Sequence, residues 1–357
     1  MKNSLEFNIQ FSNLMGRSFP NCFAGVYVYL ENIFAELPKK CGKKMCFGCA
    51  CSRDPQSAYF AIFETMCGKS SLYWRFDSTM TDMAALIGDN SRVGNWSGKC
   101  GTDYTVDFLF GFAGYEYQKI TDASMFKKEI IAAIDSDKPV LADLAIDDKS
   151  FSVITSYDGD TFISSYYHTD QDKDTQEKLT IILSCDDINT IYTVGNKITP
   201  RYTLKHGLER IKQVIESTFN EKIWDDGIDQ INTIFVNPTD EEFEKMSTDD
   251  VHASKKRITE TLTNQFHCHI FSSALKNLPK FYDIAQDSEL YGLLEKLRKC
   301  IATLSKYAFN RGDVLGVGLP RKDFGKKTVS AITSIKKNYS KMLEIIEQGI
   351  KILEQPK

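Results

Sequence analysis

The sequence lacks the features that mark secretion and membrane insertion. Its first 22 residues contain no continuous apolar stretch of the kind that a signal peptide carries. The longest apolar runs also fall far short of the ~20 residues that a membrane-spanning helix needs. These absences predict a soluble, cytoplasmic protein without a membrane partner.

The chain also has little excess charge. Lysine and arginine total 44, aspartate and glutamate total 48, and the net charge is −4. A nucleic-acid-binding surface needs a concentration of positive charge that this balance does not supply. The sequence has no phosphate-binding glycine loop either, because Gly316-Val317-Gly318 lacks the strand–helix context of a dinucleotide fingerprint. We therefore expect neither a nucleic-acid partner nor a cofactor.

Ten cysteines are present, at irregular spacing. In a reducing cytosol they are not expected to form a disulfide framework. Four of them, Cys41, Cys46, Cys49 and Cys51, are close enough to hold zinc or an iron–sulfur cluster, and the first three match a plant-type ferredoxin spacing. A zinc knuckle has two separated pairs, and the second pair is missing here. We predict a cysteine-rich loop without metal, with a metal- or redox-sensing protein as the alternative.

A second group of metal-ligand residues is His267-Cys268-His269. Residues two apart on a helix point about 200° away from each other, so the two imidazoles cannot easily share one ion. Apolar neighbours such as Phe266 and Phe271 favour a packed helix instead.

Two kinds of periodicity divide the chain near Pro200. Before it, helical stripes alternate with strand-like segments, and Asp158-Gly159-Asp160 marks a hairpin turn. After it, the spacing is helical to the end. The sequence predicts an α+β domain over residues 1–200, with an N-terminal helix on an antiparallel sheet, and an all-α domain over 201–357. The expected helices are 21–37, 57–67, 101–112 and one capped by Asp122, and the expected strands are 72–75, 115–120, 139–146, 151–157, 161–167, 179–183 and 190–194.

Two apolar stripes stand out in the C-terminal domain. Leu290, Leu294, Leu297, Ile301 and Leu304 mark one helix, and a second stripe at near-heptad spacing runs from Ile332 to Leu353. These stripes predict the core of a helix bundle, and homo-oligomer contacts through the C-terminal helices are the alternative.

Cys22 is the candidate nucleophile. Pro20 and Asn21 precede a helical stripe, and Asn21 is a good N-cap, so Cys22 is expected at the first helical position. Backbone N–H groups and the helix dipole favour a thiolate there, and the thiolate is the nucleophilic form of cysteine. The alternative is a buried structural cysteine.

The order of these elements resembles a known family. A helix opens at Asn21-Cys22-Phe23-Ala24-Gly25, another at 101–106, and a later strand reads 150–158, SFSVITSYD. This succession resembles the bacteriocin-processing branch of papain-like peptidases, and in particular the family of the N-terminal domain of butirosin biosynthesis protein H, over about residues 15–195. The resemblance implies a papain-like cysteine hydrolase fold and a bacterial, secondary-metabolic role. It further implies a small-molecule or peptide substrate and an acyl carrier protein as partner.

The resemblance also assigns roles to residues. Cys22 falls on the nucleophile, but the position of the catalytic histidine falls at or near Ser150, and the stretch 16–20 directly before Cys22 holds no glutamine to donate to an oxyanion. His168, at the end of the next strand, is the candidate replacement base, with Asp170 or Asp172 to orient it, and the alternative is a solvent-exposed loop histidine. Two hypotheses follow: a cysteine-dependent acyltransferase or amide hydrolase, and a catalytically inactive papain-like domain that binds a ligand or a partner.

Overall fold

A computed structural model of the chain describes residues 2–7, 19–33, 55–67, 105–145, 151–170, 175–218, 221–263, 268–309 and 320–355. The protein is of the α+β class, with two antiparallel four-stranded sheets followed by a helical region. Contacts divide the described residues into two units, one that ends at Leu204 and one that begins at Lys205. None of the described helices combines the length and apolar character that a membrane span requires.

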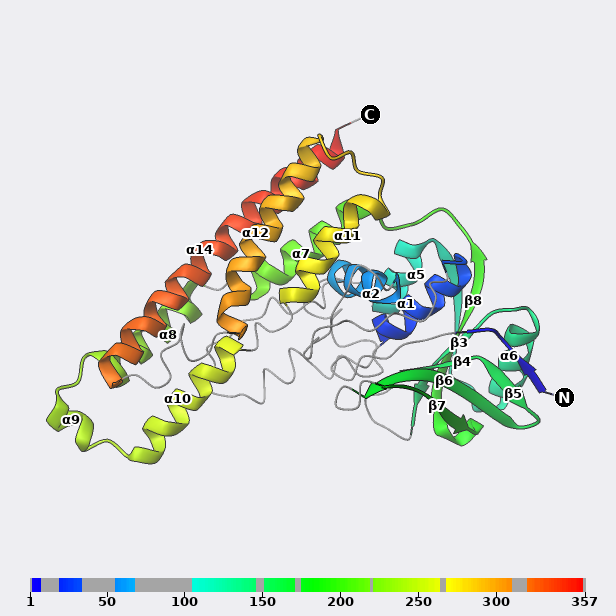
Figure 1. Cartoon of the computed structure of the whole chain (residues 1–357), viewed down its shortest axis with the longest axis horizontal. Helices are drawn as coiled ribbons and strands as arrows, with labels where there is room; N and C mark the ends of the chain where they lie inside the picture. The colour runs from blue at the N-terminus through cyan, green and yellow to red at the C-terminus, as the bar shows by residue number, and fades with distance from the viewer. Residues whose placement is uncertain are drawn as a thin grey trace. The chain divides into compact units, whose positions relative to one another are not determined.

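The first unit contains both sheets (Figure 1). Neighbouring strands are antiparallel throughout, and the order in the first sheet is β1-β5-β6-β7 and in the second β2-β8-β3-β4. The strands are β1 (Lys2–Ser4), β2 (Tyr115–Ile120), β3 (Val140–Leu144), β4 (Phe151–Ile154), β5 (Ser156–Asp158), β6 (Thr161–Asp170), β7 (Thr175–Leu183) and β8 (Ile188–Lys197).

One chain segment joins the two sheets. Strands β4 and β5 are separated only by Thr155. The Thr155 N–H donates to the carbonyl of Ile163 at 3.0 Å, and the Thr155 carbonyl accepts from the N–H of Leu5 at 2.9 Å. The segment therefore supplies a strand to each sheet. The next turn is the predicted hairpin, in which Gly159 has a positive φ of 63°.

Helix α6 (Ala123–Asp135) packs on one face of the strands. The predicted cap is confirmed, because the Asp122 carboxylate accepts from the Ser124 N–H at 3.0 Å. Phe126, Ile130 and Ile134 are buried against apolar side chains of both sheets, among them Val140, Ala142, Leu144, Phe162, Leu183 and Ile191.

Three helices form a layer on the side of the second sheet away from α6 (Figure 1): one contacts β4, one contacts β2, and the third packs on the first. They are α1 (Phe19–Leu30), α2 (Pro55–Met66) and α5 (Thr105–Ala113). Aromatic rings join them: the Phe23 ring centroid lies 5.2 Å from that of Phe63 on α2 and 4.8 Å from that of Phe110 on α5. Edge-to-face pairs of this kind stabilise beyond the area they bury. Helix α1 is thus held by its neighbours on one side and by the sheet on the other.

Helix α1 ends earlier than its sequence predicts. The apolar stripe predicts a helix to residue 37, but α1 stops at Leu30, and Asn32 adopts a left-handed φ of 52°. Asparagine tolerates this conformation and commonly follows a helix C-terminus. The predicted strand at 72–75 lies outside the described residues.

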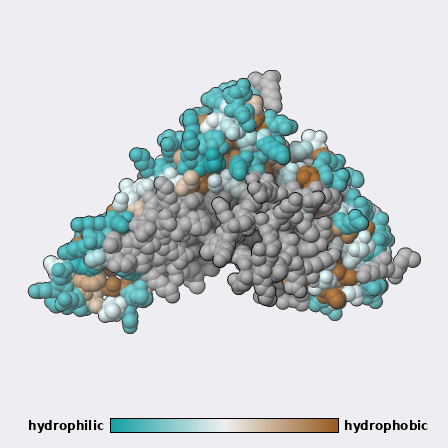
Figure 2. All heavy atoms as spheres, in the orientation of Figure 1, coloured by the Kyte–Doolittle hydropathy of each residue, from teal (hydrophilic) through white to brown (hydrophobic). Residues whose placement is uncertain are grey.

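The second unit is helical wherever the structure describes it, with no strand between residues 205 and 355, as its sequence predicts. The apolar stripes of the last two long helices are buried within the single chain, as expected for a bundle core. On the face shown in Figure 2, hydrophilic side chains cover the outer surface of these helices. The elements are α7 (Leu204–Thr218), α8 (Glu221–Ile231), a π-helical segment (Asn232–Val236), α9 (Asp240–Glu244), α10 (Thr248–Thr263), α11 (Cys268–Phe281), α12 (Glu289–Phe309) and α14 (Arg321–Glu354).

Gly325 lets α14 approach the π-helical segment closely. A Cβ atom at Gly325 would lie 2.7 Å from Val236 Cγ2 and 2.8 Å from Phe235 Cβ. We expect Gly325→Ala to lower the free energy of unfolding by about 1–3 kcal/mol, because the helices must separate. The matched control is Gly292→Ala on α12, whose Cβ would meet no heavy atom within 4 Å. That variant should gain roughly 0.5–1 kcal/mol from helix propensity. Urea unfolding followed by circular dichroism measures the free energy of unfolding of both variants. If both variants were stabilised, or both destabilised, the close contact between α14 and the π-helical segment would be contradicted.

Candidate functional site

Cys22 is not at the start of its helix. Helix α1 begins at Phe19, so Cys22 is its fourth residue, and the prediction that Asn21 caps the helix is wrong. The reason is Pro20, which fits the first turn because amides there have no partner within the helix. Asn21 is instead buried inside the helix, where its carbonyl and its Oδ1 each accept from Gln56 Nε2 at 3.4 Å.

The Cys22 side chain lies in the packed interior. Phe19 and Val26, three residues before and four after, share its face of α1, and all three residues have a relative exposure of 0%. The Phe19 ring lies 5.2 Å from the ring of Phe151 on β4 and 5.9 Å from that of Tyr192 on β8. Cys22 therefore belongs to the stripe of α1 that packs on the second sheet.

That sheet face carries one carboxylate that the sequence reasoning missed. Asp143 on β3 lies directly opposite Phe151 on β4 and Thr190 on β8, and opposed residues of antiparallel strands share a face. Burial, followed by the negative charge of Asp143, raises the pKa of Tyr192. The signal was present in the sequence, because Asp143 is the charged residue inside the otherwise apolar run 139–144. Its carboxylate places a negative charge on the face that α1 covers.

The predicted base and its partner lie in β6. The backbone of His168 pairs with Glu177 and that of Asp170 with Thr175, at the end of the β6–β7 hairpin. Strand β6 contacts β4 at Ser164, four residues before His168, where the Ser152 hydroxyl donates to Ser164 Oγ at 2.6 Å. At ~3.3 Å per residue, the His168 backbone is about 13 Å further along the strand. The side chains of His168 and Asp170 lie outside the described residues, so their roles stay predictions.

Several other candidates lie outside the described part of the chain. These are Cys41, Cys46, Cys49 and Cys51, Ser150 at the expected histidine position, and His267. Cys268 and His269 begin helix α11, so these two residues are helical as expected. Within the described ranges, no group of three or more His, Cys, Asp or Glu side chains is placed to hold a metal ion.

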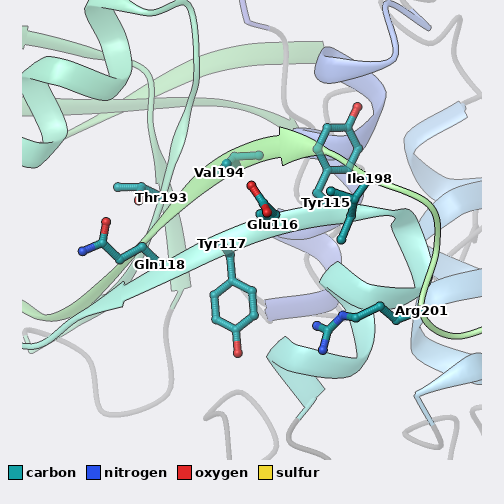
Figure 3. Close-up of a pocket in the computed structure, with 9 residues that line it drawn as sticks. Tyr115, Glu116, Tyr117, Gln118, Thr193, Val194, Ile198 and Arg201 are labelled. Carbon is teal, nitrogen blue, oxygen red and sulfur yellow. The ribbon is translucent and has the colours of Figure 1, made fainter.

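A shallow groove of about 620 Å³ runs along the edge of the second sheet, at strand β2 (Figure 3). Its far end is Arg201, which donates to Asp107 Oδ1 at 2.8 Å, while the Tyr202 hydroxyl donates to Asp107 Oδ2 at 3.0 Å. The hydrogen bond to Asp107 raises the pKa of Arg201, which stays charged. The groove is lined by Tyr115, Glu116, Tyr117, Gln118, Thr193, Val194, Gly195, Ile198 and Arg201.

A β-bulge shapes this groove. The register between β2 and β8 shifts between Tyr115 and Tyr117, so these two rings leave β2 on opposite sides (Figure 3). Gly195 is required at the bulge, because a Cβ there would lie 2.7 Å from Glu116 Cβ. The Tyr117 ring stacks on Phe110 with centroids 4.6 Å apart, which fixes one wall.

The groove offers binding groups rather than a reacting group. The exposed Glu116 and Gln118 side chains, the Arg201 guanidinium and the Tyr117 ring can hold a ligand by charge, hydrogen bonds and stacking. Among the described residues that line the groove there is no cysteine, serine or histidine. Comparisons of the chain with protein-family models, curated proteins and solved structures give no significant match.

Proposed function

We propose that residues 1–200 form a papain-like domain that binds a small molecule or a peptide without using Cys22 as a nucleophile. The observation that carries this proposal is the complete burial of Cys22 between Phe19 and Val26. A helix packed on an antiparallel sheet, with α1 contacting β4, supports the papain-like part of the proposal.

The burial argues against covalent catalysis for a physical reason. A nucleophilic cysteine must reach a carbonyl carbon and must lose its proton, so it needs access and either a base or an electropositive site. A side chain with no exposed surface does not offer that access. The sequence adds to this argument, since serine stands where the family has its histidine and His168 is the one histidine before residue 200.

The groove at β2 is the ligand site in this proposal. A positive guanidinium, a carboxylate and an aromatic wall suit a polar ligand with a flat or extended portion, such as a peptide segment. The Arg201–Asp107 and Tyr202–Asp107 hydrogen bonds hold the segment after β8 against α5, so the site exists before the ligand binds.

A cysteine-dependent acyltransferase or amide hydrolase is the second candidate function. The observation that favours it is Asp143, a carboxylate on the sheet face that α1 covers. In this alternative, α1 must move to expose Cys22 before any acyl group can reach the sulfur.

Substituting Cys22 distinguishes the two candidates. If Cys22 is a core residue, Cys22→Ser should lower the free energy of unfolding by roughly 1–3 kcal/mol, because it buries a hydroxyl in an apolar place. Cys300→Ser is the matched control, since Cys300 is 4% exposed in the second unit and burial raises the pKa of its thiol. Cys185→Ser, at a half-buried position, should cost much less. A Cys22→Ser protein as stable as the parent would favour the enzyme.

A further inference from the structure

Strand β7 forms an edge of the first sheet. In the part of the chain that the structure describes, β7 pairs with β6 on one side only (Figure 1). The pairing is regular along all nine residues, from Phe162 opposite Leu183 to Asp170 opposite Thr175, without a bulge. A regular edge presents a row of backbone N–H and C=O groups that can pair with another strand.

The other sheet edges carry protective features that are absent from residues 179–183 of β7, although the first half of β7 includes the charged residues Glu177 and Lys178. Strand β1 has only three residues, and all four residues of β4 are buried. Strand β2 carries a bulge and the exposed charges of Glu116 and Lys119. Bulges, short strands and charges are the usual means by which proteins prevent edge-to-edge pairing. Strand β7 therefore differs from the other described edges.

Strand β7 also carries an exposed apolar side chain. Ile182 is 69% exposed, and among the described residues it is the one large hydrophobic side chain classed as exposed. Thr180, on the same face of the strand, is exposed too. The segment 179–183, LTIIL, is uncharged and rich in β-branched residues, which suits it to a further strand pairing.

We propose that two copies of this chain pair through antiparallel β7 strands centred on Ile181. A twofold axis through this point places Ile182 opposite Thr180 of the second copy, and Leu183 opposite Leu179. Directly opposed residues of antiparallel strands lie on the same face of the sheet. This register meets that condition, because Thr180 and Ile182 lie on one face of β7 and Leu179 and Leu183 on the other.

The charges of β7 favour this register over one centred on Thr180. With the axis at Ile181, Lys178 and Glu177 fall beyond the apolar pairs, opposite Ser184 and Cys185 of the second copy. An axis at Thr180 would instead put Lys178 opposite Ile182 and Glu177 opposite Leu183. The segment thus complements itself under twofold symmetry, and the product is a continuous eight-stranded sheet. This interface is independent of the ligand groove and of the C-terminal helices.

The test is the molar mass of the full chain at micromolar concentrations, measured by size-exclusion chromatography with light scattering and by sedimentation velocity. We expect the parent protein to have twice the mass of the monomer. Ile182→Lys should raise the dissociation constant by about tenfold or more, since it removes apolar contact and places a charge near the centre of the paired strands. Circular dichroism and thermal unfolding check that the variant is folded.

Two control variants separate this interface from others. Gln118→Lys adds the same charge to the edge strand β2 and should leave the dimer intact, and Ile182→Val should also leave it intact. A monomeric parent protein, a dimer that Ile182→Lys does not weaken, or open-ended aggregates in place of a dimer would each overturn the proposal.

Discussion

Replacing Phe23 with alanine should lower the free energy of unfolding by about 3–5 kcal/mol, the largest stability effect that we expect. The Phe23 ring is 1% exposed and contacts Phe63 on α2, Phe110 on α5 and Phe19 on α1 itself, with the last pair of centroids 5.9 Å apart. Alanine leaves a cavity where three helices meet and removes the aromatic pairs. Equilibrium unfolding in urea, followed by circular dichroism, measures the loss.

Two further variants calibrate this prediction. Phe23→Leu refills most of the cavity and should cost no more than about half as much. Phe281→Ala, at a half-buried position near the end of α11, should cost less than Phe23→Ala because less apolar area is lost. A Phe23→Ala protein within roughly 1 kcal/mol of the parent would mean that the α1–α2–α5 contacts do not stabilise the first unit.

Local patterns predicted much of the first unit. Apolar patterns predicted strands that overlap β2, β3, β6, β7 and β8, and the cap at Asp122 and the turn at Gly159 were identified from residue type alone. These features are set by neighbours within a few residues, which is the range over which capping and turn preferences act. The helical character of the described residues after Lys205 was predicted in the same way, because the change of periodicity near Pro200 is local. The single strand expected at 151–157 in one sheet was wrong, because Thr155 divides it into β4 and β5, which belong to two sheets.

Features that depend on distant residues were not predicted. The start of α1 was misplaced because Pro20 serves equally well before a helix and inside its first turn. The hydrogen bonds between Gln56 and Asn21 join residues 35 positions apart, and no local pattern reveals them. Asp143 was overlooked for a similar reason, since its importance comes from the strands on either side of it.

In the candidate site, too, local features could be predicted and features that depend on distant residues could not. Cys22 could be chosen from the sequence, but its burial depends on how α1 packs on the sheet, where the Phe19 ring contacts the rings of Phe151 and Tyr192. The groove depends on a bulge between β2 and β8 and on Arg201 reaching Asp107 across 94 residues. A single sequence contains no marker for either arrangement.

The reactivity of Cys22 gives the second large effect. A thiol with no exposed surface reacts with iodoacetamide only when α1 opens locally. We therefore expect alkylation of Cys22 in the folded protein to be at least about 100-fold slower than in the urea-unfolded protein at the same pH. Half-buried Cys185 is the internal reference and should react faster. Because the chain has ten cysteines, peptide mass spectrometry must resolve the sites, with Cys22→Ser to confirm the assignment.

The most direct measurement of the central claim is the alkylation rate of Cys22 as a function of pH, in the parent protein and in His168→Ala. Our account predicts slow alkylation of Cys22 at every pH at which the protein stays folded, and the same rates in His168→Ala. Fast alkylation of Cys22 below pH ~7 that His168→Ala abolishes would contradict it, because that result requires an accessible thiolate paired with an imidazole.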